Sequence, residues 1–260
     1  MGQLRFLGAL WKANLLAAME YRGAFFFQVA GMALNNAIYF TFWILFFERF
    51  PAVRGWGVHE MLVLFGVAAG GFGLAVYLFG NALRLAELIA GGRLDYYLSL
   101  PRPALLHALA SRSVPSGLGD FLYGCLSFAL SGPGSAAEVL RFVLGLIFAM
   151  AVFLGFMVLV QSLAFWMGHA GLVGSQAMNA LISFALYPLD LFDGTAKLVL
   201  FTVLPAAFMG AVPAEFVRSF TWQGLAQLTG ASLVFLGLGV VVFHRGLRRY
   251  ESGSAIQVEV

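Results

Sequence analysis

The sequence predicts an all-α integral membrane protein built as one domain over residues 1–260, and its composition carries that prediction. Hydrophobic residues make up 61% of the 260 residues, charged residues make up 10%, and the mean hydropathy is +0.90. A soluble domain carries about 25% charged residues, so this chain could not cover its surface with polar side chains. Several apolar runs also approach the length of about 20 residues that a helix needs to cross a bilayer.

Residues 3–20 predict an amphipathic helix that lies on the membrane surface. Its apolar residues recur at helical spacing and its polar residues fall off that stripe. The stripe consists of Leu4, Leu7, Trp11, Leu15 and Ala18, and the polar residues are Gln3, Lys12 and Glu20. These polar interruptions make a signal peptide a poor description. A frayed leader with accidental spacing is the alternative.

Six runs are predicted to span the membrane: 24–47, 61–80, 113–130, 139–167, 172–189 and 222–244. The third is the weakest of them because it contains Pro115 and Asp120. A seventh run, 196–212, is shorter and is interrupted by Pro205, which favours a re-entrant pair of half-helices over a span. Residues 245–260 are then a cytoplasmic tail.

The distribution of basic residues favours six spans with both termini in the cytoplasm. Ten then lie inside: Arg5, Lys12, Arg22, Arg84, Arg93, Arg102, Arg112, Arg245, Arg248 and Arg249. Five lie outside: Arg49, Arg54, Arg141, Lys197 and Arg218. A seventh span would change the distribution of basic residues to eight inside against seven outside. Because cytoplasmic loops carry an excess of Lys and Arg, this arrangement is disfavoured.

Glycines in the second span predict a close helix contact. Gly66 and Gly70 have the spacing that lets another helix backbone approach. Packing within the chain is the simpler interpretation, and a contact between subunits is the alternative.

Polar residues in the first and fifth predicted spans share helical faces and predict a lined substrate pathway. The residues are Gln28, Asn35, Asn36 and Tyr39 in the first span, and Gln176, Asn179, Ser183 and Tyr187 in the fifth. An amide in hydrocarbon must face protein or water, because an unpaired one costs several kcal/mol. Uncharged amides and aromatic rings suit an amphiphilic organic substrate better than a bare ion. Interhelical hydrogen bonding without a substrate is the alternative.

Asp120 is the only acid deep inside a predicted span. It is a candidate ion or proton relay. Pairing with a nearby side chain is the favoured interpretation, because buried acids are usually hydrogen-bonded. The candidate partners are Tyr123, Ser116 and Arg112.

The segment 91–102, within the polar region 82–112, is the longest polar interruption in the first half of the chain. It reads Gly-Gly-Arg-Leu-Asp-Tyr-Tyr-Leu-Ser-Leu-Pro-Arg. A linker needs no apolar residues, so this mixture predicts a structured contact surface.

With its flanks, this segment resembles the cytoplasmic loop after the second span of type-2 ABC exporter permeases. The matching positions are Glu87, Gly92, Leu94-Asp95, Leu98 and Pro101. The form Gly-x-Leu-Asp-Tyr…Leu-Pro-Arg-Pro is similar to the branch that includes proposed viologen and multidrug exporters.

The resemblance implies a permease that forms a dimer of identical or related chains in the inner (plasma) membrane. It also implies a cytoplasmic ABC ATPase subunit that binds ATP and Mg²⁺, so this chain would hold no cofactor. Each permease would insert a short coupling helix into a cleft of the ATPase. The implied anchors are Leu94, Tyr96, Tyr97 and Leu98, and the implied charged frame is Arg93, Asp95 and Arg102. An amphipathic helix resting on lipid headgroups is the alternative.

Other classes of function have less support from the sequence. The chain has no phosphate-binding loop, no metal-binding histidine pair and no basic run suited to nucleic acid, so we expect neither an enzyme nor a metal site. An ion-coupled secondary transporter that uses Asp120 remains an alternative, although no internal repeat is evident. A membrane scaffold or assembly protein is the other alternative.

Overall fold

The computed structural model of the chain describes residues 2–167 and 170–250. Over these ranges the protein is helical and has no strand, apart from one isolated bridge between Val53 and Trp56. The α-helices are α1 (Gln3–Ala18), α2 (Arg22–Arg49), α3 (Val58–Leu78), α4 (Leu85–Ala90), α5 (Leu94–Leu98), α6 (Ala104–Ala110), α7 (Ser116–Leu130), α8 (Ala136–Gln161), α9 (Ala170–Ala185), α10 (Gly194–Thr202), α11 (Ala211–Arg218) and α12 (Trp222–Leu247). Short 3₁₀ turns join several of them: η1 (Met19–Tyr21), η2 (Gly80–Arg84), η3 (Ser162–Phe165), η4 (Leu189–Leu191) and η5 (Ala206–Phe208). The prediction of an all-α protein with several apolar helices is confirmed.

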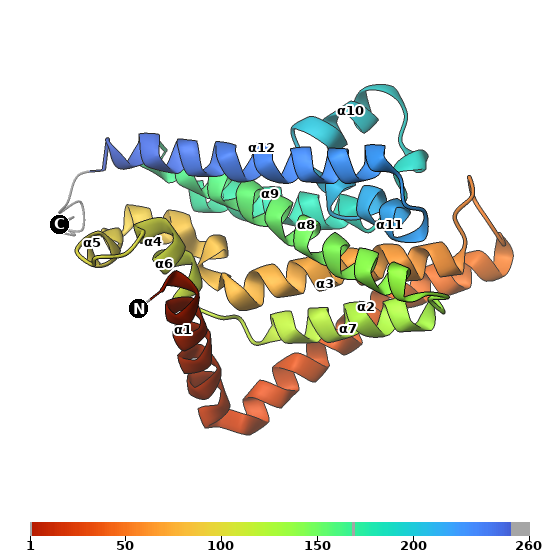
Figure 1. Cartoon of the computed structure of the whole chain (residues 1–260), viewed down its shortest axis with the longest axis horizontal. Helices are drawn as coiled ribbons and strands as arrows, with labels where there is room; N and C mark the ends of the chain where they lie inside the picture. The colour runs from red at the N-terminus through yellow and green to blue at the C-terminus, as the bar shows by residue number, and fades with distance from the viewer. Residues whose placement is uncertain (1, 168–169, 251–260) are drawn as a thin grey trace.

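Helices α2, α3, α8 and α12 form a bundle and belong to the four helical segments that are long and apolar enough to cross a membrane. Helices α7 and α9 run beside them in Figure 1, but their described lengths are 15 and 16 residues. At about 1.5 Å per residue they are shorter than the hydrocarbon core of about 30 Å. The six-span topology therefore stays a prediction. Helix α8 continues into the 3₁₀ turn η3, and together they form one apolar segment, Ala136–Phe165, that covers most of the predicted range 139–167.

The two ends of the bundle differ. Figure 1 places the start of α1, the end of α12 and helices α4, α5 and α6 at one end, which we call the α5 end. The loop after α2 and helices α10 and α11 lie towards the opposite end, which we call the α10 end. The start of α1 and the end of α12 therefore lie on the same side of the bundle.

The segment predicted as re-entrant is a pair of helices with a sharp bend. The 194–202 and 206–218 helical segments meet at 67°, around a break that contains Pro205. Pro205 lacks the N–H that a continuous helix would need there. Because α10 and α11 both lie towards one end of the bundle (Figure 1), this arrangement favours a re-entrant pair over a span.

Helix α1 lies across the bundle near the α5 end, at an angle to α2 (Figure 1). The indole of Trp11 donates a hydrogen bond to the Leu78 carbonyl at 2.8 Å, and Asn14 donates to the Ala110 carbonyl at 3.1 Å. Of the predicted apolar stripe, Leu7 is buried but Leu4 is 83% exposed. Part of the stripe therefore faces protein. Of the predicted tail 245–260, residues 251–260 lie outside the described residues.

Helix α3 is the buried centre of the bundle and touches α7 backbone to backbone. A Cβ built at Gly124 of α7 would lie 2.6 Å from the Gly66 oxygen and 2.7 Å from the Gly70 Cα. No side chain fits at that separation. The interpretation of Gly66 and Gly70 as a packing site within the chain is confirmed. Helices α8 and α12 meet in the same way, because a Cβ on Gly239 would lie 2.6 Å from the Gly155 oxygen.

Replacing Gly124 tests this contact. Gly124→Ala should force α3 and α7 apart and lower the free energy of unfolding by about 1–3 kcal/mol, as overpacking does. Thermal unfolding of the detergent-purified chain measures the effect. Gly230→Ala on α12 is the matched control, because a Cβ at Gly230 meets no atom within 4 Å. Equal stability of the two variants would contradict the close contact.

Candidate functional site

Helix α5 is a short surface helix at the α5 end and contains five of the ten residues predicted to couple to a partner. Gly92 precedes it with φ +68°, a left-handed conformation that glycine adopts without strain and that turns the chain after α4. Tyr96 is 64% exposed and Leu98 is 40% exposed. Arg93 is exposed as well. These three side chains form the outward face of the segment, which we call the α5 face.

Two of the four predicted anchors do not point outward. Leu94 is fully buried in the hydrophobic core. Tyr97 is half-buried, and its hydroxyl lies 2.8 Å from the Ser111 Oγ in a hydrogen bond. The prediction that all four residues anchor a partner was therefore too broad. Leu94 and Tyr97 instead fix α5 to the rest of the chain, because Leu94 is enclosed in the core and the Tyr97 hydroxyl is bonded to Ser111.

A network of polar side chains ties α5 and α6 to the end of α3. Asn81 in η2 donates to the Ala108 carbonyl at 2.8 Å and to the Ser111 Oγ at 2.9 Å. The same Ser111 oxygen bonds Tyr97. This network joins the helix that carries the α5 face to the central span through well-formed bonds.

Gln161 provides a second link, from α8 to the same region. Its side-chain nitrogen donates to the Leu83 carbonyl at 2.8 Å, and its oxygen accepts from the Ala86 N–H at 3.2 Å. The side chain is buried, so both backbone groups depend on it for a partner. Sequence reasoning missed Asn81, Ser111 and Gln161. The signal for Gln161 was available, because it is the single amide in the apolar run 139–167.

The remaining predicted coupling residues surround the α5 face. Glu87 forms an ion pair with Arg84 at 2.6 Å. Pro101 is exposed, and the Arg102 guanidinium lies 4.9 Å from the centre of the Phe6 ring in α1. Tyr250, which follows α12, lies near Asp95 of α5, and burial together with this carboxylate raises the pKa of Tyr250 to about 12.

An aromatic cluster around His107 joins α1 to α5. The His107 ring packs edge-on against Phe6 at 4.9 Å and against Tyr97 at 5.2 Å. Burial, with a smaller contribution from Arg102, lowers the pKa of His107 below its usual value of about 6.5. The folded state therefore prefers the neutral ring. This contribution to stability is complete above pH of about 6.5 and is lost as the pH falls through the folded-state pKa.

The residues predicted to line a pathway lie on two separate exposed faces. Most of them are exposed: Gln28, Asn35, Tyr39, Gln176, Asn179, Ser183 and Tyr187. The structure brings only Tyr187 close to α2, where its ring packs 5.5 Å from Trp43. Over residues 2–167 and 170–250, the two faces do not meet to enclose a channel within one chain.

Asn36 differs from the other predicted pathway residues because it is engaged inside the chain. Its amide nitrogen donates to Asp120 Oδ1 at 2.6 Å and to the Met32 carbonyl at 3.1 Å. Asp120 is a residue of α7, is 4% exposed and faces α2. The prediction that Asp120 is paired is confirmed, but Tyr123, Ser116 and Arg112 were the wrong partners. The contact comes from a different helix, which local sequence spacing cannot reveal.

Substitutions at Asp120 separate a structural role from ion coupling. Asp120→Leu should lower the free energy of unfolding by about 1–3 kcal/mol, because the Asn36 amide loses its acceptor. Asp120→Asn retains an acceptor oxygen and should fold and transport normally. Adding Asn36→Leu to Asp120→Leu should cost less than the sum of the single changes. Thermal unfolding and transport assays measure these effects. A well-folded Asp120→Asn variant without transport would refute the structural role.

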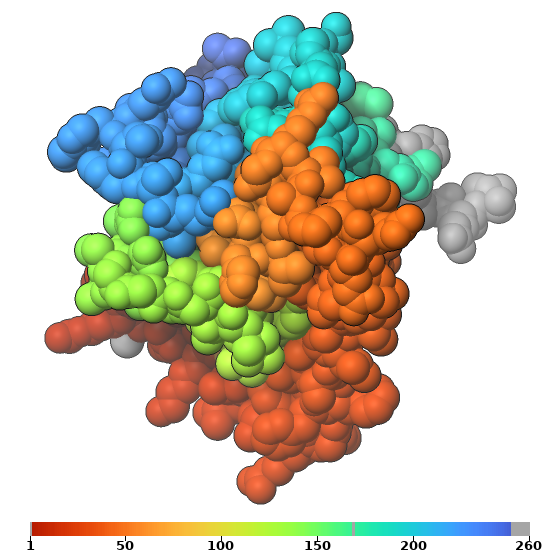
Figure 2. All heavy atoms as spheres, turned by 90° about the vertical axis from the view of Figure 1, so that its right-hand side faces the viewer, coloured from red at the N-terminus to blue at the C-terminus, as the bar shows by residue number. Residues whose placement is uncertain are grey.

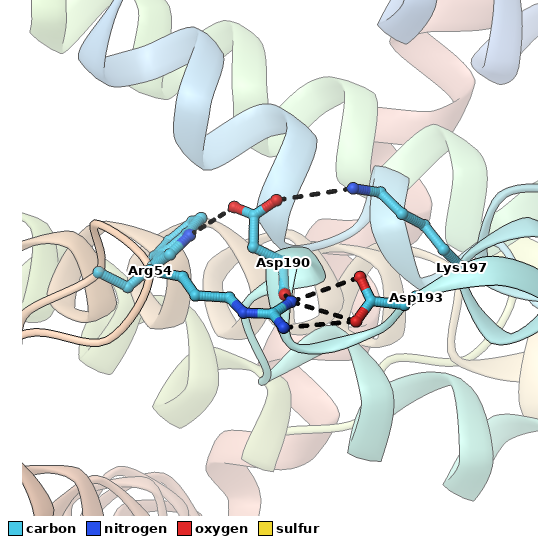
Figure 3. A network of polar contacts seen from close by, with 5 residues as sticks. Arg54, Asp190, Asp193 and Lys197 are labelled. Atoms are coloured by element: carbon cyan, nitrogen blue, oxygen red, sulfur yellow. Dashed lines mark hydrogen bonds and ion pairs between the residues drawn. The ribbon is translucent and has the colours of Figure 1, made fainter.

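Charged residues at the α10 end form a second cluster, which links the loop after α2 to the segment before α10 (Figure 3). Asp190 accepts from the Trp56 indole at 3.0 Å and pairs with Lys197 at 3.5 Å. Arg54 pairs with Asp193 at 3.4 Å and bonds the Asp190 carbonyl. Figure 2 shows the orange surface of this loop against the cyan surface near α10. These contacts hold the two segments together.

The two acids of this cluster should differ in their contribution to stability. Trp56 is 3% exposed, so Asp190→Ala leaves a buried indole N–H without its acceptor and should cost about 1–2 kcal/mol. Asp193→Ala is the matched control. Its side chain is 79% exposed, and the loss of such a pair should cost at most about 0.5 kcal/mol. Thermal unfolding compares them, and a larger loss for Asp193→Ala would contradict this assignment.

Comparison with known proteins identifies a family. A family model described as "ABC-2 family transporter protein" matches residues 33–254. The match includes α3 to α12 with the α5 face, and it begins inside α2. Comparison with curated proteins and with solved structures gave no match.

Proposed function

Because the chain belongs to the ABC-2 family of transporter proteins, we propose that it is the membrane permease subunit of an ABC exporter. In this proposal an amphiphilic or hydrophobic organic substrate crosses the membrane, and a separate cytoplasmic ATPase drives it. ATP and Mg²⁺ bind to that partner. This chain supplies the membrane path and the surface on which the partner docks.

The observation that carries the proposal is the α5 face. A partner with a groove needs a few apolar or aromatic anchors and charges that set the orientation. Tyr96 and Leu98 offer the anchors, and Arg93 offers a charge at the rim. The buried Leu94 and the Tyr97–Ser111 bond hold this face firmly against the bundle. A displacement of α5 would therefore be transmitted to α3 through Asn81 and to α8 through Gln161.

This role places the α5 end in the cytoplasm and the α10 end outside. Both termini would then be cytoplasmic, in agreement with the ten-to-five split of basic residues. The membrane is the inner (plasma) membrane in this proposal.

The exposed polar residues support a second permease subunit. In a bilayer, the amides of Asn35, Gln176 and Asn179 would meet hydrocarbon on a lone chain, and each unpaired amide costs several kcal/mol. A second copy or a related chain facing α2 and α9 would enclose these groups in a cavity. Such a cavity suits an amphiphilic substrate, because amides and aromatic rings line it together.

Truncation of the exposed tyrosine tests the docking role. Tyr96→Ala should weaken association with the ATPase by about 2 kcal/mol, or about thirtyfold, because a buried aromatic anchor is lost. Co-purification of the ATPase and ATP turnover in reconstituted membranes measure the effect. Tyr97→Phe should change association much less, because Tyr97 packs within the chain.

Tyr21→Ala is the matched control. Tyr21 is 73% exposed, similar to Tyr96, but it lies at the junction of α1 and α2. Its loss should leave both ATPase binding and turnover unchanged. If Tyr96→Ala binds the ATPase and transports at the wild-type rate, the α5 face is not the docking surface.

A further inference from the structure

A hollow of about 570 Å³ lies beside the α5 face. It is bounded by η2, α4, the start of α5 and the segment between α6 and α7. The lining residues are Asn81, Arg84, Leu88, Gly92, Arg93, Tyr96, Tyr97, Ser111 and Arg112. Three of them are arginines and none is acidic, so the hollow has a strongly positive lining.

Two of these guanidinium groups have no counter-charge among the described residues. Arg84 pairs with Glu87 at the rim. Across residues 2–167 and 170–250, the side chains of Arg93 and Arg112 form no ion pair or hydrogen bond. The inner wall adds polar groups from Asn81, Tyr97 and Ser111. Like charges gathered in one hollow repel each other, and an anion placed among them would relieve that repulsion.

The hollow lies where the central helices reach the end of the bundle. The Arg112 carbonyl accepts from the Gly80 N–H at 2.9 Å, just after α3 ends and just before α7 begins. Trp11 of α1 bonds the last residue of α3, Leu78, in the same region. Tryptophan is enriched at the membrane–water boundary, at the depth of the lipid headgroups. Trp11 therefore indicates that the hollow lies at the depth of the headgroups. In the proposed orientation these are the headgroups of the cytoplasmic leaflet.

We propose that this hollow binds a phosphate group, supplied by the headgroup of an anionic phospholipid. The proposal rests on the membrane orientation given above. Guanidinium groups bind phosphate oxygens in pairs, through two parallel hydrogen bonds. A phosphate between Arg93 and Arg112 would join α5 to the start of α7. An anionic lipid would thereby hold the α5 face in place, and the composition of the inner leaflet would influence coupling.

Lipid titration of the purified chain tests the site. The full chain, delipidated in a neutral detergent, is titrated with phosphatidylglycerol, with phosphatidylcholine or with inorganic phosphate. Native mass spectrometry counts the bound molecules. The wild type should retain phosphatidylglycerol in preference to phosphatidylcholine. Each basic residue near an anionic lipid contributes about fivefold in affinity, so Arg93→Gln/Arg112→Gln should bind phosphatidylglycerol about thirtyfold more weakly.

Matched variants keep the test decisive. Arg245→Gln removes the same charge from the exposed end of α12, outside the hollow, and should bind like the wild type. Arg112→Gln alone should fold normally, because its exposed guanidinium contacts no partner in the described part of the chain, and its affinity for phosphatidylglycerol should fall about fivefold. This single variant decides the matter if the double variant fails to fold.

The outcomes separate the sources of phosphate. Loss of phosphatidylglycerol binding in the hollow variants, with none in Arg245→Gln, supports the lipid. Saturable binding of inorganic phosphate that is lost in the same variants supports a soluble phosphate at the same site. Equal phosphatidylglycerol binding by the wild type and the hollow variants would overturn the proposal. The proposal would also be overturned if the hollow variants lost ATPase co-purification while the wild type bound neither lipid nor phosphate. The hollow would then receive a carboxylate of the partner. Lipid binding in a chain that never co-purifies with an ATPase would refute the proposed function and leave the site intact.

Discussion

The direct backbone contact between α3 and α7 is the constraint on which the rest of the structure depends. Gly124 of α7 has no side chain, so α7 approaches the Gly66–Gly70 backbone of α3 to a distance that a Cβ at Gly124 would prevent. Helix α3 is thereby buried at the centre, where both α7 and α8 pack on it. The position of α7 then brings Asp120 to Asn36 of α2. In a bilayer, such contacts replace the hydrophobic effect that would drive packing in water.

The polar network at the α5 end connects α5 to this closely packed centre. Asn81 extends from the end of α3, and Gln161 extends from the end of α8. Both reach the region that carries α5, through bonds of 2.8–3.2 Å. A loop attached only by its peptide chain would absorb movement. A helix held by buried amides and by Leu94 transmits movement to the spans, which is the property that coupling to an ATPase requires.

Sequence reasoning reached the fold class because composition and apolar runs depend on the chain alone. The Gly66 and Gly70 spacing and the break at Pro205 were also readable, since each acts through local backbone geometry. Contacts between residues far apart in the chain could not be predicted from the sequence. The partner of Asp120 is 84 residues away in the sequence, and the inward rotation of Leu94 and Tyr97 depends on Ser111 and the core. The hollow was missed because Arg84, Arg93 and Arg112 come together only when η2, α5 and the end of α6 meet.

Photo-crosslinking from position 96 tests most directly whether the α5 face contacts an ATPase. A photoreactive phenylalanine analogue at position 96, in native membranes, should form an adduct with a subunit that carries an ATP-binding cassette. The adduct should increase or decrease when ATP is added, because the docking surface changes during the cycle. The same analogue at position 21 should form none. A crosslink from position 21, or an intact complex with no crosslink from position 96, would contradict the account.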